Sequence, residues 1–444
     1  MRGLPLFRTA LCAGLLAIAC GSSSNDGGSG NSAIGGTNSS GAGSGNGASG
    51  SGTSSAGSGT TPSGGSGNAT AGSSSGGTGA VSGGANSGGA SAGGASGGTS
   101  NAGASNGGST SGAGTAGSGG TAPAGDLWIA TNGSDSNPGT EALPILNLAN
   151  AIARLTAGHG IFIKDGTYKY TNVISISKRG TATGTYTISA APGAHPIIDF
   201  TGQALGTRGF DLQGDYWHIV GFEVENAGDN CIAISGSHNT IELMKIHGCQ
   251  DTGLQITVST ADVADNTRGA YNTVLNCDSF ENFDQATGGE NADGFAAKLR
   301  IGPGNAFKGC RSYNNSDDGW DFFAADDVVT IDSSWAFSNG KGVNGNNPDG
   351  DGNGFKLGGK PTSTGEGGAV HLVTNSFGFE NLACGFTQNS NPDVPKLTGC
   401  GARGNGEDDY CQTLSRSNTV AMTMTAAQAK AAARNADGSL PPMK

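Results

Sequence analysis

The sequence predicts a single-stranded, right-handed parallel β-helix, an all-β solenoid closed at its N-terminal end by a capping helix. The first observation is a Gly-apolar-variable-apolar motif that recurs every 22 to 41 residues, with Cys231 in place of the first glycine; the later glycines are Gly253, Gly294, Gly319, Gly354 and Gly385. The second is a strand-like stretch upstream of each motif, and the third is a bend that contains asparagine. Short strands in coils of this length, separated by Gly, Asn and Asp turns, are typical of a parallel β-helix.

The capping elements come first along the folded part. Residues 126–130 predict a strand, a turn-forming run follows at 132–139, and 146–155 have the apolar spacing of an amphipathic helix able to cover the open end of the core. The β-helix is expected over residues 126–416. Residues 417–444 are expected to form a loose tail with a short helix at 426–433.

Within each coil, the residues one and three places after the glycine are mostly apolar and should point inward, so the residue between them should point outward. Upstream strands are expected at 272–277 and 306–310. Asparagines at the bends predict an internal ladder of stacked side-chain amides: Asn226, Asn282, Asn314, Asn339 and Asn381.

The folded part contains seven cysteines, and an odd number leaves at least one thiol free. An exported protein permits disulfides, and Cys400 and Cys411 are the pair expected to be bridged. Stacked coils predict that Cys249, Cys277 and Cys310 are small buried fillers and do not form disulfides. The sequence has no CxxC pair and no Cys/His cluster, which disfavours a zinc site.

The first 125 residues predict export and attachment. Residues 1–20 form a signal peptide, with Arg2 and Arg8 before a short apolar run. The segment 16–20 resembles a bacterial lipobox, in which Cys20 receives lipid; an ordinary signal peptide with an incidental cysteine is the alternative. Residues 21–125 are almost wholly Gly, Ser, Ala, Thr and Asn and should form a flexible tether. The expected location is therefore the bacterial surface or outer membrane, with contact to the membrane only through the lipid.

The formal net charge of −12 argues against a nucleic-acid partner, which would require a basic surface. An acidic protein that meets an acidic substrate would require a cation between them. A tethered β-helix is most simply a monomer.

Stacking of the coils predicts one site. Asp321 and Lys356 fall at the same outward position of successive repeats, about 4.8 Å apart, and Asp293 and Asp318 share the position before the glycine. Asp317 precedes Asp318. Four carboxylates beside a lysine would repel one another without a divalent cation, and calcium suits an all-oxygen ligand set.

Other aspartates have simpler explanations as turn residues: Asp326, Asp327, Asp332, Asp349 and Asp351. Lys356 by itself is equally explained by a salt bridge to Asp321.

Three segments, 290–299, 315–322 and 351–359, resemble polysaccharide lyase family 9, the pectate lyase type. The resemblance implies that Asp293, Asp317, Asp318 and Asp321 bind Ca²⁺ and that Lys356 is the Brønsted base. It implies cleavage of α-1,4-linked polygalacturonate by β-elimination, with the pKa of Lys356 lowered by the neighbouring cation.

Four further cations are candidates for holding neighbouring uronates, although each is also explained as a solvated surface charge: Lys298, Arg300, Arg311 and Lys360. Two other functions remain open from the residues alone. A polygalacturonase-like hydrolase would use Asp317, Asp318 and Asp321 as acid and base, and a non-catalytic surface carbohydrate-binding protein would use the patch structurally.

Overall fold

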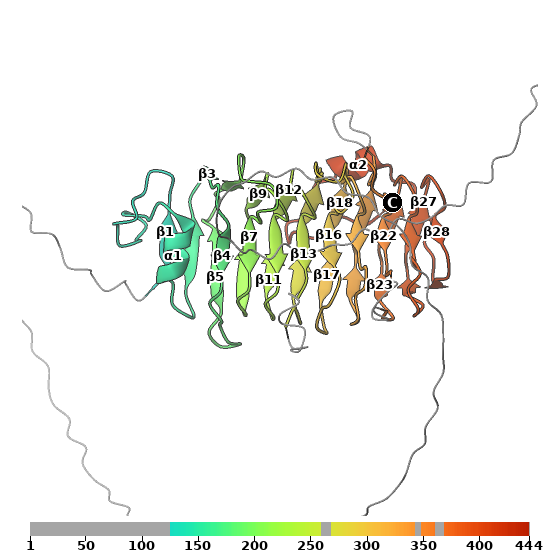
Figure 1. The fold of residues 1–444 in the computed structure, drawn as a ribbon, viewed down its shortest axis with the longest axis horizontal. Helices are drawn as coiled ribbons and strands as arrows, with labels where there is room; N and C mark the ends of the chain where they lie inside the picture. Colours follow the sequence, from blue (N-terminus) through green and yellow to red (C-terminus); the bar gives the residue numbers. More distant parts are fainter. Residues whose placement is uncertain (1–124, 259–267, 342–347, 360–367, 444) are drawn as a thin grey trace, which may run out of the picture. The chain divides into compact units, whose positions relative to one another are not determined.

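The computed structural model describes residues 125–258, 268–341, 348–359 and 368–443. Its strands form three parallel β-sheets. The chain visits the three sheets in turn, once per coil, so that each strand pairs in register with its equivalent in the next coil (Figure 1). The sheets form the faces of a right-handed parallel β-helix, which confirms the predicted fold class.

Sheet A has 11 strands. They are β1 Leu127–Ile129, β2 Gly160–Ile163, β5 Tyr186–Ala190, β8 Trp217–Val220, β11 Thr240–Glu242, β14 Thr273–Leu275, β17 Ala306–Lys308, β20 Thr330–Asp332, β23 Leu372–Thr374, β26 Lys396–Thr398 and β29 Ser415–Ser417. The predicted strands at 126–130, 272–277 and 306–310 correspond to β1, β14 and β17.

Sheets B and C have nine strands each. Sheet B consists of β3 Thr167–Lys169, β6 Ile197–Asp199, β9 Glu223–Glu225, β12 Lys245–His247, β15 Asp278–Phe280, β18 Arg311–Tyr313, β21 Trp335–Phe337, β24 Phe377–Phe379 and β27 Gly401–Arg403. Sheet C consists of β4 Ile174–Ile176, β7 Phe210–Leu212, β10 Ile232–Ile234, β13 Leu254–Ile256, β16 Phe295–Ala297, β19 Trp320–Asp321, β22 Phe355–Lys356, β25 Phe386–Thr387 and β28 Tyr410–Cys411.

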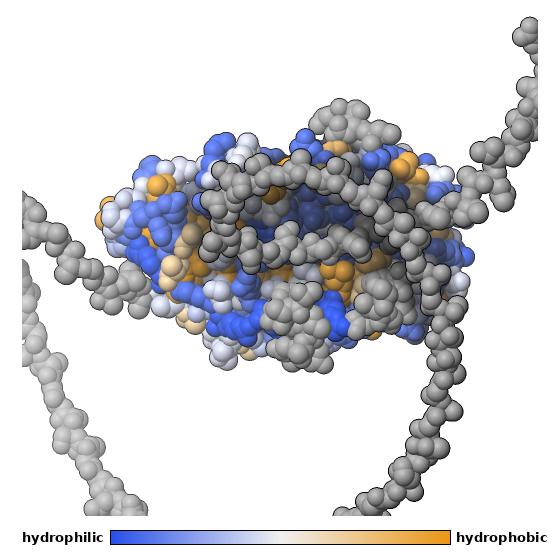
Figure 2. All heavy atoms as spheres, in the orientation of Figure 1, coloured by the Kyte–Doolittle hydropathy of each residue, from blue (hydrophilic) through white to orange (hydrophobic). Residues whose placement is uncertain are grey.

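The interior follows the predicted alternation. The residue directly after the motif glycine points inward in successive coils, and its aromatic rings stack along the core: Phe295 on Trp320 at 5.1 Å, Trp320 on Phe355 at 4.7 Å, and Phe355 on Phe386 at 4.6 Å between ring centroids. Each such pair stabilises the fold by about 1 kcal/mol beyond the contribution from burying its apolar area. Hydrophilic residues predominate along the upper and lower edges of the domain in Figure 2.

The asparagine ladder exists, but two of its predicted members are wrong. It runs through Asn282, Asn315, Asn339, Asn381 and Asn405, whose side-chain amides bond one another at 2.8 to 3.0 Å. Asn314 has a positive φ of 55° and lies one place before the ladder residue. Asn226 also has a positive φ, 62°, and donates instead to Asp199 and Thr201. Asparagine tolerates this left-handed conformation. An asparagine at this bend can therefore either adopt the positive φ, as Asn226 and Asn314 do, or join the ladder, as Asn315 does.

A second ladder lies at the bend before sheet A and was not predicted. Asn239, Asn272 and Asn305 bond through their amides at 3.1 Å. His371 holds the equivalent place before β23, where its Nδ1 accepts from the backbone N–H of Val329 at 3.2 Å. Both ladders satisfy backbone groups that the sharp bends would otherwise leave unpaired in the interior.

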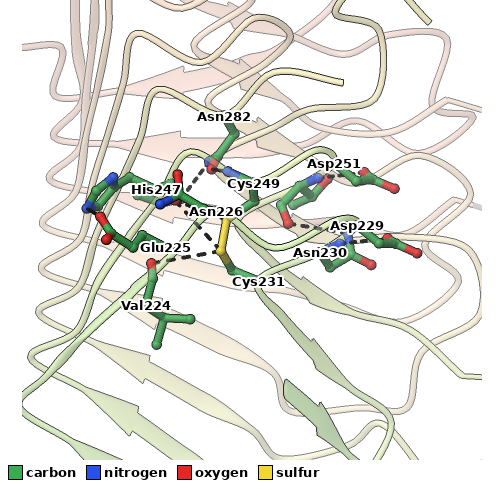
Figure 3. Close-up of a disulfide and its surroundings, with 12 residues drawn as sticks. Val224, Glu225, Asn226, Asp229, Asn230, Cys231, His247, Cys249, Asp251 and Asn282 are labelled. Carbon is green, nitrogen blue, oxygen red and sulfur yellow. Dashed lines mark hydrogen bonds and ion pairs between the residues drawn. A yellow bond between two sulfur atoms is a disulfide. The ribbon is translucent and has the colours of Figure 1, made fainter. Parts of the chain in front are cut away.

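The cysteine pairing differs from the prediction. The disulfides are Cys231–Cys249, shown in Figure 3, and Cys384–Cys411. Cys277, Cys310 and Cys400 are free and buried. The predicted bridge between Cys400 and Cys411 is wrong because Cys400 lies at the bend before sheet B, where its Sγ contacts the Val373 carbonyl, whereas Cys411 lies on sheet C. Cys249 is likewise a disulfide partner and not a filler.

One helix lies near each end of the described chain, and the second packs back against sheet B. Helix α1, Leu148–Arg154, places Leu148, Ala151 and Ile152 in the core, within the predicted span 146–155. Helix α2, Ala426–Ala431, begins where expected and ends two residues early. Neither helix is long and apolar enough to cross a membrane, and the described residues contain no other candidate.

The C-terminal tail packs against sheet B, which contradicts the expectation that it is loose. Met422 and Ala429 share a buried cluster with Tyr313, Phe337 and Phe379 on the outer face of that sheet. The outward aromatic column of sheet B is therefore covered by the chain itself.

Candidate active site

The acidic cluster predicted from the repeats lies at the bend between sheets B and C, in the coils of β16, β19 and β22. Asp293 and Asp318 precede the motif glycine in successive coils, and Asp317 precedes Asp318. One carboxylate oxygen from each of these three residues lies within 4.8 Å of those of the other two. Asp321 and Lys356 are register partners on the outer face of sheet C. The predicted neighbours Asp293 and Asp318, and Asp321 and Lys356, therefore do lie in adjacent coils, but the converging group holds three of the four predicted carboxylates and leaves out Asp321.

Backbone and amide donors hold the carboxylates in place. Asp318 Oδ1 accepts from the backbone N–H and the side-chain Nδ2 of Asn353, at 2.6 and 2.9 Å. Asp293 Oδ1 accepts from the backbone N–H of Asp318 at 3.2 Å, and Asp317 Oδ1 from that of Asp351 at 2.7 Å. Because each bond joins neighbouring coils, the stacking that builds the fold also fixes the spacing of the charges.

Two lysines border the cluster, Lys298 buried and Lys356 partly exposed. Lys298 Nζ lies 3.1 Å from Asp293 Oδ2 and 3.4 Å from Asp321 Oδ2. Lys356 Nζ lies 3.0 Å from Asp318 Oδ2, an oxygen that is buried and accepts no hydrogen bond from the described residues. The side chain of Lys356 is 11 % exposed and that of Asp318 is fully buried, so the lysine is the more accessible of the two.

The charges do not balance within the protein. Burial raises the pKa of Asp293 and of Asp318 well above the ordinary value, because the attraction of the lysines does not offset it. Burial disfavours the charged form of Lys356, but the attraction of Asp318 and Asp321 outweighs it and raises the pKa of that lysine. The protein groups together therefore do not give the expected lowering of this pKa, and a further positive charge beside Lys356 would be needed to produce it.

Two site residues were missed from the sequence. Asp351, assigned to a turn, has its Oδ2 3.2 Å from Lys356 Nζ. Asn353 occupies the same position before the motif glycine as Asp293 and Asp318, so the column that revealed those aspartates also contained the signal for it. With Asp351, five carboxylates surround two ammonium groups.

A further carboxylate lies one coil toward the N-terminus. Burial raises the pKa of Asp251 to about 7, with the attraction of Lys298 acting against it and the repulsion of Asp229 adding to it. Asp229 and Asp251 lie on the same side of the Cys231–Cys249 disulfide (Figure 3). Carboxyl side chains thus continue toward the N-terminus beyond the four predicted aspartates.

The four candidate substrate-binding cations lie in different places. Lys298 is inside the acidic cluster and is not a solvated surface charge. Arg300 lies beyond the end of β16 and stays a prediction, and Lys360 lies outside the described residues. Arg311 is on sheet B, and the prediction for it is wrong: its guanidinium pairs with Asp278 at 2.7 Å, and its Nη1 donates to the carbonyls of Ala429 and Ala432 at 3.1 and 2.8 Å. It anchors the C-terminal tail.

The turn interpretation agrees with the contacts of two other aspartates. Asp326 accepts from the backbone N–H of Ile301, and Asp332 accepts from Thr374 and Asn375 in the next coil. These side chains tie one coil to the next and take no part in the cluster.

Fold and site together define a class: a right-handed parallel β-helix with a carboxylate cluster and a lysine on one face. The chain belongs to the Pel9A-like right-handed β-helix family, whose model matches residues 127–422. Its described elements from β1 to β29 lie within that match.

Named relatives agree with this placement. Pectate lyase L of Paenibacillus polymyxa is 39% identical over 300 residues, which cover 65% of each chain. Pectate lyase L of Dickeya dadantii is 38% identical over 60% of this chain and 61% of its own. Pectate lyase PEL9 of Emericella nidulans is 34% identical over 62% of this chain and 72% of its own. The crystal structure of pectate lyase Pel9A superposes with a TM-score of 0.60 at 31% identity, over 71% of this chain and 87% of that one. The chain thus spans less than two thirds of the length of the first two relatives.

Proposed function

We propose that this chain is a calcium-dependent pectate lyase that cleaves α-1,4-linked polygalacturonate by β-elimination. The observation that carries the proposal is the contact of Lys356 Nζ with Asp318 Oδ2 at 3.0 Å, at the edge of a buried three-carboxylate cluster. An aspartate that only caps a turn would not be expected to pair through a buried oxygen with a lysine of the neighbouring coil. The named pectate lyases among the relatives support the same activity.

The donor set fits calcium. Asp293, Asp317 and Asp318 offer converging carboxylate oxygens, and Asp321 adds a fourth carboxylate from the outer face of β19. Hard oxygen donors in an irregular arrangement are the ligands that Ca²⁺ prefers. The buried Asp318 Oδ2 accepts no hydrogen bond from the described residues and already lies 3.0 Å from one cation, the ammonium of Lys356, so it is an acceptor that a second cation could share. When bound, Ca²⁺ would draw in the substrate carboxylate and make its C5 proton more acidic.

Lys356 takes that proton. Neutral Nζ accepts the proton from C5, the C5–H electron pair forms the C4–C5 double bond, and the C4–oxygen bond breaks toward the leaving sugar, which is then protonated. Lys356 acts this way only when neutral, and the surrounding carboxylates favour its protonated form. Alkaline pH and a high positive charge in the cluster should therefore both increase activity.

Ultraviolet absorbance of the unsaturated product tests the proposal. The full chain is incubated with polygalacturonate in Ca²⁺ or in chelator, beside Lys356→Ala and the matched surface variant Lys396→Ala, whose lysine is exposed on β26. We expect Ca²⁺-dependent absorbance that Lys356→Ala loses by at least about 10³-fold and Lys396→Ala retains. New reducing ends without absorbance would mean hydrolysis, and binding without cleavage would support the carbohydrate-binding alternative.

We also propose that the chain is exported and attached by lipid at Cys20, with residues 21–125 as the tether and the β-helix acting as a monomer. The residues preceding Cys20 and the composition of the tether support this. Fractionation of cells that express the wild type and Cys20→Ser tests it: release of only the variant into the soluble fraction is expected. Release of both would favour an ordinary signal peptide.

A further inference from the structure

A pocket lies next to Lys356 on the C-terminal side of the acidic cluster. Its volume is about 330 Å³, within the range of small-ligand sites. The residues of sheet C that face outward form one column through Asp321, Lys356, Thr387 and Cys411, each in register with the next. Because neighbouring coils are about 4.8 Å apart, Thr387 and Cys411 place the pocket one to two coils from the proposed base.

The lining of the pocket combines hydrogen-bonding groups with an apolar floor. Asn353, Thr387, Asn389 and Gln412 supply amides and a hydroxyl, and the Cys384–Cys411 disulfide supplies apolar surface. Amides and hydroxyls beside a small apolar area are the groups that a sugar ring with a methyl substituent would contact. The pocket therefore has the chemistry of a carbohydrate subsite continuous with the cluster.

The charge of the pocket is the unusual feature. Its two charged lining residues among those described are both acidic, Asp351 and Glu407, and its described lining contains no lysine, arginine or histidine. Asp351 is partly balanced by Lys356 at 3.2 Å. Glu407 has its Oε2 3.6 Å from Cys384 Sγ, and the described part of the chain shows no ion pair to it. A free uronate carboxylate in this pocket would meet like charge.

We infer that this pocket is a subsite that selects a methyl-esterified galacturonate over free galacturonate, with Glu407 as the specificity-determining residue. The inference rests on the proposed lyase activity and names the substrate pattern that the activity would use. The sugar at the acidic cluster keeps its free carboxylate, and the sugar one to two coils further along is uncharged. The preferred polymer is then partly, and not fully, de-esterified.

The size of the effect follows from the charges. Two carboxylates about 4 Å apart in a water-like surrounding repel by about 1 kcal/mol, which corresponds to about a five-fold difference in kcat/KM. Glu407→Gln keeps the shape of the side chain and removes this repulsion. Because Glu407 is exposed, the difference should shrink as salt screens the two charges.

The test compares kcat/KM of the full chain on polygalacturonate and on partly methyl-esterified polygalacturonate. We expect Glu407→Gln to raise the ratio of the first to the second by about five-fold at low ionic strength, and Glu407→Lys to raise it further. Glu141→Gln removes the same charge at the N-terminal end and should leave the ratio as in the wild type. An unchanged ratio in both Glu407 variants would overturn the inference. A loss of polygalacturonate cleavage with an increased Ca²⁺ requirement would also overturn it, because Glu407 would then help to hold a cation that bridges to a uronate.

Binding separates this inference from the proposed activity. Equilibrium binding of galacturonate oligomers, free and partly methyl-esterified, is measured with Lys356→Ala alone and combined with Glu407→Gln. If no polymer is cleaved by the wild type but the esterified oligomer still binds better, and Glu407→Gln abolishes that preference, the proposed activity fails and the subsite stands. Equal binding of both oligomers by Lys356→Ala would overturn the subsite even if cleavage is observed.

Discussion

The imidazole of His371 should make the domain lose stability on acidification. Burial lowers the pKa of His371 from 6.5 to about 4. The ring is fully buried, its Nδ1 accepts from the backbone N–H of Val329 at 3.2 Å, and its Nε2 has no hydrogen-bond partner among the described residues. Protonation would put a second N–H against the Val329 donor, so the folded state holds the neutral ring with the proton on Nε2.

The magnitude follows from the two pKa values. Between pH 6.5 and 4 the unfolded chain binds a proton at this histidine and the folded chain does not, so the free energy of unfolding decreases as the pH falls. At 1.36 kcal/mol per pH unit the loss reaches about 3 kcal/mol near pH 4, below which both states are protonated. Above pH 6.5 the contribution is complete.

Denaturant unfolding of the wild type and His371→Asn from pH 7 to 4 checks this. Asparagine retains an acceptor for Val329, as in the ladder at the equivalent positions of earlier coils, and cannot ionise. We expect the variant to gain about 3 kcal/mol relative to the wild type over this range, and the exposed-histidine control His195→Asn to follow the wild type. Parallel stability curves for the wild type and His371→Asn would refute the reasoning, since the carboxylates that also titrate here are common to both.

Three further predictions concern the cluster, the tail and the ladder. Asp318→Asn should abolish the stabilisation by Ca²⁺, about 2.7 kcal/mol at a hundred times the Kd in the wild type, whereas the surface variant Asp393→Asn should keep it; equal shifts of the unfolding midpoint in both would contradict the ligand assignment. Arg311→Ala should cost about 3 kcal/mol and speed proteolysis of the tail, so an unchanged cleavage rate would argue against its anchoring role. Asn339→Leu should lower the free energy of unfolding by about 3 kcal/mol, because it leaves buried amide groups of the ladder unpaired, and a cost under about 1 kcal/mol would contradict this.

The fold was predictable because every coil buries apolar residues at the same positions of its repeat. An inward apolar pair after each glycine can be read from the sequence without knowing the loops, and the register of Asp321 with Lys356 follows from it directly. It was harder to predict which asparagines belong to the ladder. Asn314 and Asn315 are adjacent at one bend, and only the backbone conformation decides which amide turns inward.

Features that depend on contacts between non-equivalent positions were not predictable. Cys384 and Cys411 occupy different places in their repeats, so no column brings them together, and their pairing depends on the shape of the bend before β28. Arg311 was assigned to substrate for a similar reason. Its partners Ala429 and Ala432 come from a tail whose path over sheet B has no periodic signal.

The burial of the aspartates and the partial exposure of Lys356 also favour a lyase over a hydrolase. A hydrolase needs a carboxylic acid that reaches the glycosidic oxygen and a carboxylate that activates water. Asp318 has a pKa raised by burial, as a general acid requires, but its side chain is fully buried, with one oxygen accepting from Asn353 and the other facing Lys356. Asp317 and Asp321, the other two candidates for a hydrolase, are also buried. Carboxylates placed this way suit a buried cation, and Lys356, which is partly exposed at the edge of the cluster, is the group that a substrate atom would meet.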